Sequence, residues 1–437
     1  MSESKQKIVP TEPRWRRAAR RLVWLEPVWV MAIGVLLLLP QRFLPTSVQQ
    51  QVEVWRASAV ILPVMGGLLR WLAYGRLTRR TPLDWPLLLM LIWLPVNYWA
   101  SVDKAASWEA LSPLIVGVAL FWALLNWPPA LRHPQLIGWS IVVMGVGLAF
   151  TAPLFSDLAI GKLFRISALE TLQQKLSASL PGNVNANQIA GVLAVVAPLA
   201  AALTLRRDWR THRRATIAAG LATMFILAML ALTQSRGAYL AAAIAIGVVA
   251  VLRWRKLVYV VPFLLVAAII MVAVLGPLTV LNAALSGGAI SGLDGRLEIW
   301  SRALYAINDF PFTGIGIGTW NTVIPTLYPL FSIAPDTKLD HAHNLLLQVG
   351  LDVGLPGFIA YVALYLTTFG LLIKALRQQI AALDVALAAG AVAALSAMFI
   401  HGIVDVPLWD SKPAFLPWLI IALAILLGLR TLTPQPD

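Results

Sequence analysis

Residues 257–282 read LVYVVPFLLVAAIIMVAVLGPLTVLN and contain no charged side chain. A helix needs roughly 20 mostly apolar residues to cross the hydrocarbon core of a bilayer, and this stretch is long enough. It therefore predicts a membrane-spanning helix. Similar stretches bring the predicted total to about twelve and indicate an all-α integral membrane fold. The predicted spans are residues 23–39, 57–74, 83–100, 111–127, 135–155, 188–205, 215–233, 238–252, 257–282, 355–376, 382–404 and 414–429.

The composition of the whole chain agrees with this prediction. Of its 437 residues, 59% are hydrophobic and only 12% are charged, whereas about 25% of the residues in an average soluble domain are charged. A soluble protein of this size needs more charge on its surface. The composition therefore excludes a soluble enzyme, a soluble nucleic-acid-binding domain and a disordered chain. The absence of cysteine excludes disulfides, thiolate nucleophiles and cysteine-based metal sites.

The positive charges of the predicted loops give an orientation. A net charge of +14 suggests a polyanionic partner in a soluble protein, but in a membrane protein Lys and Arg collect in cytoplasmic loops. One side of the predicted bundle carries about 22 Lys and Arg residues and the other about 11, so the positive-inside rule places both termini in the cytoplasm. The basic segment before the first span lacks a small-residue cleavage site, and we expect that span to be uncleaved.

Two long segments fall on the outer face of this topology. Residues 156–187 and 283–344 are longer than simple connections, and loops of such length are usually functional or disordered. The second has a helical pattern from Arg296 onward, so we expect an ordered, partly helical loop across the bundle. We divide the chain into an N-terminal bundle of about five spans, residues 1–181, and a second domain, residues 182–437, that includes this loop. The expected apolar face of the loop helix consists of Leu297, Trp300, Leu304 and Ile307.

Two arginines at the outer ends of predicted helices are candidates for anion binding. Arg236 lies in the tight turn Gln-Ser-Arg-Gly, residues 234–237, against the positive-inside trend. It either snorkels to the interface or offers its guanidinium to a phosphate or carboxylate. Arg296 opens the loop helix, where Glu298 and Arg302 can pair but Arg296 has no obvious partner at i+3 or i+4. The positive end of the helix dipole favours an anion at that position.

Residues 340–344, Asp-His-Ala-His-Asn, hold two of the five histidines where the long loop re-enters the membrane. Three interpretations stay open. In the first, these side chains only cap a helix and form hydrogen bonds. In the second, Asp340, His341 and His343 bind a metal ion, although no further His or Cys ligand is evident nearby. In the third, an imidazole is a general base or orients an acceptor, because His is the usual proton acceptor near neutral pH.

Three further signals are weaker. Residues 182–188, Gly-Asn-Val-Asn-Ala-Asn-Gln, precede a span, and their asparagines either cap the helix or bind sugar hydroxyls. The glycine run 314–318 looks like a nucleotide loop but follows no predicted strand, so we expect a tight, packed loop instead. His401 and Asp405 form a polar pair in the penultimate span, where buried polar groups are costly unless they are used.

Four motifs follow one another in the second domain. They are Ser235-Arg236-Gly237, then Gly295-Arg296 with Ile299-Trp300, then Asp-Phe-Pro-Phe-Thr-Gly-Ile-Gly at 309–316, and finally His343-Asn344 with Gly350, Gly354 and Gly357 after it. In this order and spacing they resemble the O-antigen ligase family, which shares its signature domain with the O-antigen polymerases. The resemblance covers roughly residues 182–429, and the first five spans add only agreement in hydropathy. One departure is that the family often has Pro-Asn before the sixth span, whereas this chain has Ala186-Asn187.

The resemblance implies a GT-C-like, metal-independent glycosyltransferase without a cofactor in the inner (plasma) membrane of a bacterium. Its site would face the periplasm or the exterior. The donor would be a glycan on undecaprenyl diphosphate, and the acceptor a hydroxyl of lipid A-core or of another surface glycan, as in the synthesis of lipopolysaccharide and other envelope polysaccharides. Membrane lipids would surround the protein, and nucleic acid would not be a partner.

The same resemblance implies roles for individual residues. Arg236 and Arg296 would neutralise the charge that grows on the leaving diphosphate. His343 would accept a proton from the acceptor hydroxyl or orient that hydroxyl. The residues expected to bind substrate are Asn187, His341, Asn344 and Trp300, and no metal ligand is expected.

Several alternatives remain open from the sequence. A polysaccharide polymerase differs from a ligase mainly in its acceptor, which is a second repeat unit, and a protein O-oligosaccharyltransferase uses the same chemistry on a protein. A twelve-span secondary transporter is the alternative from another class. Transporters usually place charged groups near the midplane and show repeats between their halves. In this chain the charged candidates gather at the outer mouth, which favours the transferase.

Overall fold

The computed structural model describes residues 13–39, 41–156, 166–167, 171, 175, 184–285, 292–333, 337, 339–378 and 381–430. Most of the predicted outer segment 156–187, and residues 286–291 of the second outer segment, lie outside this part. All regular elements in the described part are helical. The α-helices are α1 (Arg14–Trp24), α2 (Glu26–Leu38), α3 (Thr46–Gln49), α4 (Val52–Ala57), α5 (Ile61–Tyr74), α6 (Asp84–Ala100), α7 (Lys104–Leu125), α8 (Pro128–Arg132), α9 (Gln135–Phe155), α11 (Ala186–Thr204), α12 (Arg213–Leu232), α13 (Arg236–Arg253), α14 (Val261–Leu275), α15 (Pro277–Leu285), α16 (Gly292–Asp309), α17 (Trp320–Leu327), α18 (Leu345–Gln378), α19 (Ala382–His401) and α20 (Leu416–Arg430).

The membrane prediction is confirmed in class, although not in the number of spans. Among the described residues, 10 helices are long and apolar enough to cross a bilayer, or up to 11 if α1 and α2, bent by 57°, form one span. The remaining predicted span corresponds to α6, which has 17 residues. That length is at the lower limit for crossing a bilayer, about 17 residues. The structure therefore supports a multi-pass membrane protein with about ten candidate spans among the described residues.

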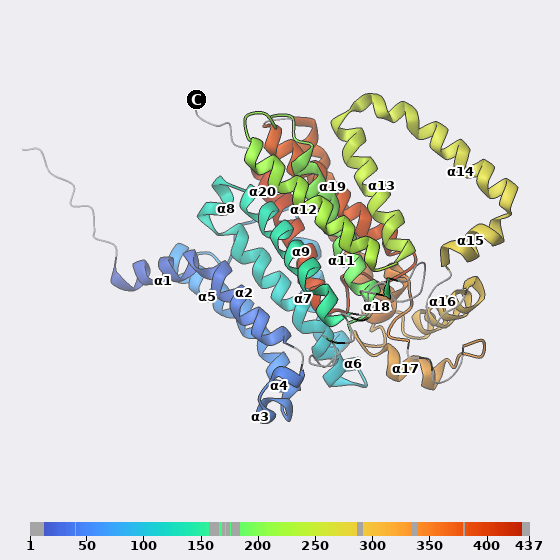
Figure 1. The fold of residues 1–437 in the computed structure, drawn as a ribbon. Helices are drawn as coiled ribbons and strands as arrows, with labels where there is room; N and C mark the ends of the chain where they lie inside the picture. The colour runs from blue at the N-terminus through green and yellow to red at the C-terminus, as the bar shows by residue number, and fades with distance from the viewer. Residues whose placement is uncertain are drawn as a thin grey trace, which may run out of the picture.

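The centre of the bundle forms where α11 packs against α12, α13 and α19 (Figure 1). Small residues let these helices approach closely, because packing between membrane helices depends on close backbone contact. A Cβ added at Gly390 of α19 would lie only 2.9 Å from the Cα of Leu199 in α11. The close packing brings the ends of α11, α13 and α19 together at one end of the bundle.

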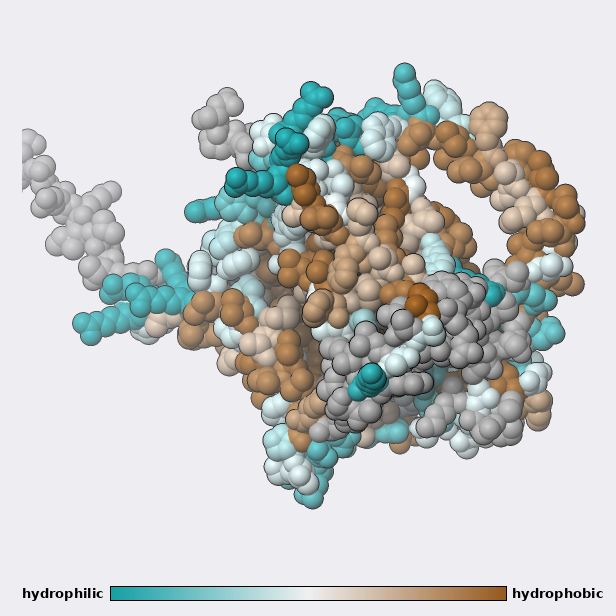
Figure 2. Space-filling view, in the orientation of Figure 1, coloured by the Kyte–Doolittle hydropathy of each residue, from teal (hydrophilic) through white to brown (hydrophobic). Residues whose placement is uncertain are grey.

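Hydrophobic residues cover the middle of the helices, and hydrophilic residues lie mainly toward their ends (Figure 2). The helix α14 stands apart from the bundle in Figures 1 and 2, and none of its residues is buried. A helix that is apolar on all sides and exposed on all sides suits a hydrocarbon environment, not water. The surface pattern therefore agrees with a chain that spans a membrane.

The glycine run 314–318 is a packed loop, as the sequence predicts. Gly314 has a φ of 66°, which favours glycine. A Cβ at that position would overlap the carbonyl oxygen of Asp352 in α18. Asn97 of α6 donates to the carbonyl oxygen of Thr313 at 3.0 Å. The loop therefore joins α6 of the N-terminal half to α18 of the C-terminal half.

The expected loop helix exists as α16, but its predicted apolar face is only partly right. Leu297 and Leu304 are 49% and 54% exposed. The side chains that are fully buried are smaller or lie on a neighbouring face, namely Ile299, Ala303 and Ala306. The helix thus packs against its neighbours through the face that carries Ile299, Ala303 and Ala306. Periodicity alone cannot distinguish that face from the adjacent face that carries the two leucines. The partner residues of this face lie in α17 and in the segments around it.

Glu298 of α16 fastens the segment that follows α17. Its carboxylate accepts from the backbone nitrogens of Phe331 at 2.6 Å and Ser332 at 2.8 Å, and it pairs with Arg302 at 3.4 Å as the i,i+4 spacing predicts. Burial raises the pKa of Glu298, but these hydrogen bonds outweigh burial and lower the pKa below its usual value. The long segment between α15 and α18 is accordingly ordered through its described part.

The orientation in the membrane is testable by cysteine labelling. A cysteine introduced at Ser332 is expected to react with an impermeant thiol reagent added outside spheroplasts, whereas a cysteine at Thr211 is expected to stay unlabelled. Both residues are exposed in the structure, and the chain has no cysteine that would give a background signal. After permeabilisation both variants should react. The reverse pattern in intact spheroplasts would contradict the orientation.

Candidate functional site

Two segments bond to each other at the end of the bundle that carries α16 and α17, hereafter the α16 end. Residues 340–344 precede α18, and residues 402–411 follow α19. Asn344 joins them, because its Nδ2 donates to the carbonyl oxygen of Ile403 at 3.2 Å. Its Oδ1 also accepts from the backbone nitrogen of Leu347 at 3.0 Å and caps α18. Asn344 is therefore a structural residue of the site, and its expected contact with substrate stays a prediction.

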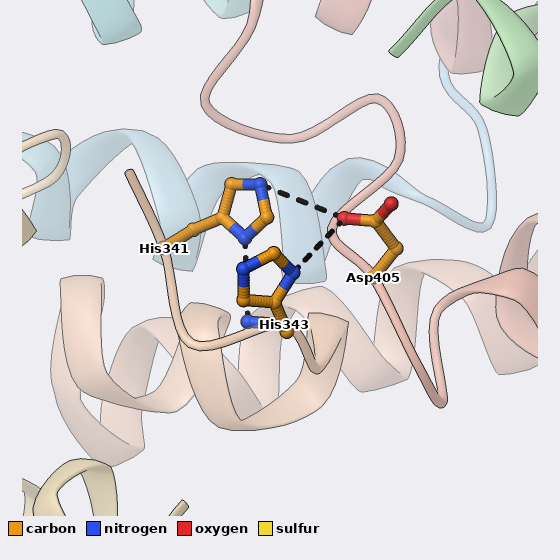
Figure 3. A group of neighbouring side chains, drawn as sticks. All are labelled: His341, His343 and Asp405. Carbon is orange, nitrogen blue, oxygen red and sulfur yellow. Dashed lines mark hydrogen bonds and ion pairs between the residues drawn. The ribbon is translucent and has the colours of Figure 1, made fainter. Parts of the chain in front are cut away.

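His341 and His343 face Asp405 across this junction (Figure 3). His341 Nε2 lies 3.5 Å from Asp405 Oδ1, and His343 Nδ1 lies 3.6 Å from the same oxygen. The two imidazole centroids are 4.3 Å apart. His343 has a φ of 49°, a backbone conformation that is uncommon for a residue with a Cβ and costs free energy. Such strain often accompanies functional side chains, and here it accompanies the close placement of the two rings.

A third histidine completes the surroundings of Asp405. His401 is buried at the end of α19, and its Nε2 lies 3.7 Å from Asp405 Oδ2. Burial raises the pKa of Asp405, but the close approach of His343 and the positive charge that the neighbouring imidazoles carry when protonated outweigh burial and hold that pKa well below its usual range. The carboxylate is therefore ionised at neutral pH and can orient each of the three rings.

The contacts also distinguish the two histidines of residues 340–344. His341 Nδ1 accepts a hydrogen bond from the backbone nitrogen of His343 at 3.3 Å, so its proton lies on Nε2, toward Asp405. Burial lowers the pKa of His341, which keeps this ring neutral at pH 7. His343 directs Nδ1 toward Asp405, and its Nε2 makes no hydrogen bond to the described residues. With its proton on Nδ1, His343 can accept another at Nε2.

Arg296 brings a positive charge from α16 to the same place. Its Nη1 donates to the carbonyl oxygen of Val404 at 2.5 Å, although no partner was evident at i+3 or i+4. Burial lowers the pKa of Arg296 by more than the nearby carboxylate of Asp405 raises it, so the pKa lies below its usual value. A guanidinium nevertheless stays charged at neutral pH. Trp300 lies one turn further on the same face. The Nε of Arg296 and the Nε1 of Trp300 are buried without a hydrogen-bond partner in the described part of the chain, which leaves two donors unsatisfied beside the cluster.

Arg236 and Asn187 lie on helices that reach this site. Arg236 is the first residue of α13, and a Cβ at the next residue, Gly237, would lie 3.2 Å from His401 Cδ2. Asn187 precedes Gly191 by one turn of α11 and shares its face. A Cβ at Gly191 would lie 3.3 Å from His401 Nδ1. The capping predicted for the asparagine run belongs to Asn185, whose Oδ1 accepts from the backbone nitrogen of Asn187 at 2.9 Å.

The metal interpretation with Asp340 as a ligand is wrong in its choice of carboxylate. Asp340 accepts from Asn321 Nδ2 at 3.1 Å and is not among the residues whose ligand atoms come together. Asp405 takes its place, and the ligand atoms of His341, His343 and Asp405 all lie within 4.8 Å of one another. Two imidazole nitrogens and one carboxylate oxygen are ligands that zinc accepts, with an open fourth position. These three residues are therefore the set that could hold a metal ion among the described residues.

Only a weak signal in the sequence points to Asp405, although this residue lies at the centre of the cluster. Its spacing of four from His401 placed both on one helix face and gave a weak signal for a buried polar pair. In the structure α19 ends at His401, and Asp405 lies beyond it in residues 402–411. That segment turns back toward residues 340–344, which makes Asp405 the common neighbour of three histidines.

A comparison with known families matches part of the chain that carries this site. Residues 221–362 match the family model described as O-antigen ligase, which confirms the resemblance over that range. The match includes Arg236, Arg296 and His343, whereas His401 and Asp405 lie beyond it. A comparison with curated proteins gives no match.

Proposed function

Taking the O-antigen ligase domain at residues 221–362 as the premise, we propose that the chain transfers a glycan from undecaprenyl diphosphate to an acceptor hydroxyl at the outer face of the bacterial inner membrane. The observation that carries the proposal is the cluster of three histidines around Asp405, with Arg296 beside it at the α16 end. This cluster combines a proton acceptor with a fixed cation, and a transfer from a diphosphate leaving group needs both.

In the proposed reaction, the acceptor oxygen forms a bond to the anomeric carbon of the donor sugar. The bond between that carbon and the diphosphate oxygen breaks, and the diphosphate leaves with the electron pair. The acceptor proton moves to His343 Nε2, while Asp405 holds the Nδ1 side and stabilises the imidazolium that forms. Arg296 and Arg236 meet the negative charge that grows on the leaving diphosphate. His341 keeps the backbone of His343 in place through its Nδ1.

The positions of Trp300 and Asn187 suggest which part of the substrate each would bind. Trp300 offers a buried N–H one turn from Arg296, which suits an oxygen of the diphosphate or of the first sugar. Asn187 can bind sugar hydroxyls through its amide, because α11 reaches the site beside His401. Both roles are part of the proposal, as are the GT-C-like character and the membrane orientation.

The reaction is testable with purified protein in lipid. Undecaprenyl-diphosphate-linked glycan should release undecaprenyl diphosphate only when an acceptor is present. Lipid A-core as the effective acceptor would identify a ligase, a second repeat unit a polymerase, and a protein serine or threonine an O-oligosaccharyltransferase. Movement of the intact donor across vesicles without release of the diphosphate would contradict the proposal and favour a transporter.

We expect this transfer to survive treatment with EDTA, because two arginines supply the positive charge that a divalent cation would otherwise provide. The measurement is the initial rate with and without chelator, followed by addition of zinc, manganese or magnesium. Loss of activity with EDTA and recovery with one cation would instead identify His341, His343 and Asp405 as its ligands.

A further inference from the structure

A further buried carboxylate, that of Asp352, lies close to the site and is not part of it. Asp352 belongs to α18 and is 0% exposed. It forms no ion pair with a cationic side chain in the described part of the chain, and both of its oxygens accept hydrogen bonds from neutral groups. A buried carboxylate is costly, and structures retain it where its hydrogen bonds fix a particular arrangement.

One oxygen of Asp352 connects to residues 340–344. Asp352 Oδ1 accepts from Gln348 Nε2 at 2.8 Å. Gln348, also fully buried, accepts from the backbone nitrogen of Ala342 through its Oε1 at 2.7 Å. Ala342 lies between His341 and His343. The amide of Gln348 therefore links the carboxylate of Asp352 to the backbone segment that carries His341 and His343.

The other oxygen connects to residues 402–411. Asp352 Oδ2 accepts from Trp409 Nε1 at 2.8 Å. Trp409 is buried and lies in the same segment as Asp405, next to Leu408, which has a φ of 60°. A single carboxylate thus holds the histidine segment on one side and the Asp405 segment on the other.

The hydrogen bonds form a chain from Ala342 N through Gln348 and Asp352 to Trp409 Nε1. Because both ends of this chain are donors, one group between them has to be an acceptor only. The backbone N–H of Ala342 and the indole N–H of Trp409 cannot act as acceptors. With a carboxylate at position 352, every link has one donor and one acceptor. With an amide at that position, one link must join two donors, whichever way the amides of residues 348 and 352 are turned.

We propose that Asp352 is a positioning residue that sets the distance between His343 and Asp405 by holding both of their segments. It touches neither ring, and it acts through Gln348 and Trp409. This inference rests on the proposed function for its effect on transfer, although the geometry of the two segments can be measured without it.

Asp352→Asn is expected to lower kcat for transfer roughly 10- to 100-fold, the effect of one buried donor left without an acceptor, with little change in KM. The matched variant is Gln348→Glu combined with Asp352→Asn. It moves the carboxylate to position 348, where it accepts from both Ala342 N and the new amide, whose oxygen accepts from Trp409. We expect this double variant to recover to within about threefold of the wild-type rate, because every donor has an acceptor again.

A second readout does not depend on transfer. Diethylpyrocarbonate modifies accessible imidazoles, and mass spectrometry can follow each of the five histidines separately. His133 and His212 are exposed and have Gln135 and Asp208 as their neighbours, not residues of the site, so they serve as internal references. In Asp352→Asn, His341 and His343 should react several-fold faster relative to these references, and in the double variant they should return to the wild-type rate.

The outcomes separate the two proposals. Wild-type labelling of His341 and His343 in Asp352→Asn would overturn the positioning role, as would equal losses in the single and double variants. If the wild-type protein released no diphosphate from any donor, the proposed function would fail, but the labelling pattern would still decide whether Asp352 holds the two segments.

Discussion

His343→Ala is expected to slow glycan transfer about 10²- to 10⁴-fold, the range for loss of a positioned general base. His343 directs Nδ1 toward the ionised Asp405, and its Nε2 makes no hydrogen bond to the described residues, so this ring combines an orienting carboxylate with an available acceptor. The 3.6 Å separation is longer than a hydrogen bond, but such contacts commonly tighten when substrate binds. The measurement is the single-turnover transfer rate of detergent-purified variants with unchanged melting temperature.

His341→Ala tests whether the adjacent histidine has a different role from His343. Both nitrogens of His341 are engaged, Nδ1 by the backbone of His343 and Nε2 by the approach to Asp405, so its loss should disturb geometry without removing the proton acceptor. We expect a milder decrease in transfer. The exposed His133 supplies a control, because His133→Ala should leave transfer unchanged. Near-normal transfer by His343→Ala would remove the proposed base and leave the fold unaffected.

Much of the fold follows from local properties of the sequence. The apolar runs predicted the helices well because a membrane span depends on its own length and hydropathy. Contacts between helices are less local. The face of α16 that packs inward uses Ile299 and Ala303 in preference to Leu297, and the reason lies in how closely α17 and its neighbours approach that helix. A prediction from periodicity has no access to that distance.

In the candidate site, too, local features can be predicted from the sequence and long-range contacts cannot. Arg236 and Arg296 stand out in the sequence as arginines at outward helix ends, and His343 as an imidazole where the long loop re-enters the membrane. Asp405 was not separable from Asp340 by sequence, since both are carboxylates near the outer ends of spans. The hydrogen bonds that join the two segments, from Asn344 to Ile403 and through Asp352 to both, explain why the rings face Asp405. Long-range pairing of this kind requires the packed structure.

The two arginines give the second large effect. Arg296→Ala and Arg236→Ala are each expected to lower transfer roughly 30- to 1000-fold, because the loss of one pre-organised donor to a transition-state charge typically raises the barrier by about 2–4 kcal/mol. Arg296 presents its guanidinium beside Asp405 and keeps a buried, unpartnered Nε–H. Arg236 begins α13 next to the contact between Gly237 and His401. Lysine should rescue either position poorly, because an ammonium cannot reproduce the bidentate fork of a guanidinium.

A structural explanation for these losses has to be tested separately, because Arg296 also donates to the carbonyl oxygen of Val404. Arg302 is the matched control. It lies on the same helix, but it pairs with Glu298 and donates to the carbonyl oxygen of Pro329, not to residues 402–411. Arg302→Ala should therefore affect melting temperature more than transfer, whereas Arg296→Ala should do the reverse. If both Arg→Lys variants transferred glycan at the wild-type rate, the arginines would act as simple point charges or not at all, and the proposed recognition of the diphosphate would be wrong.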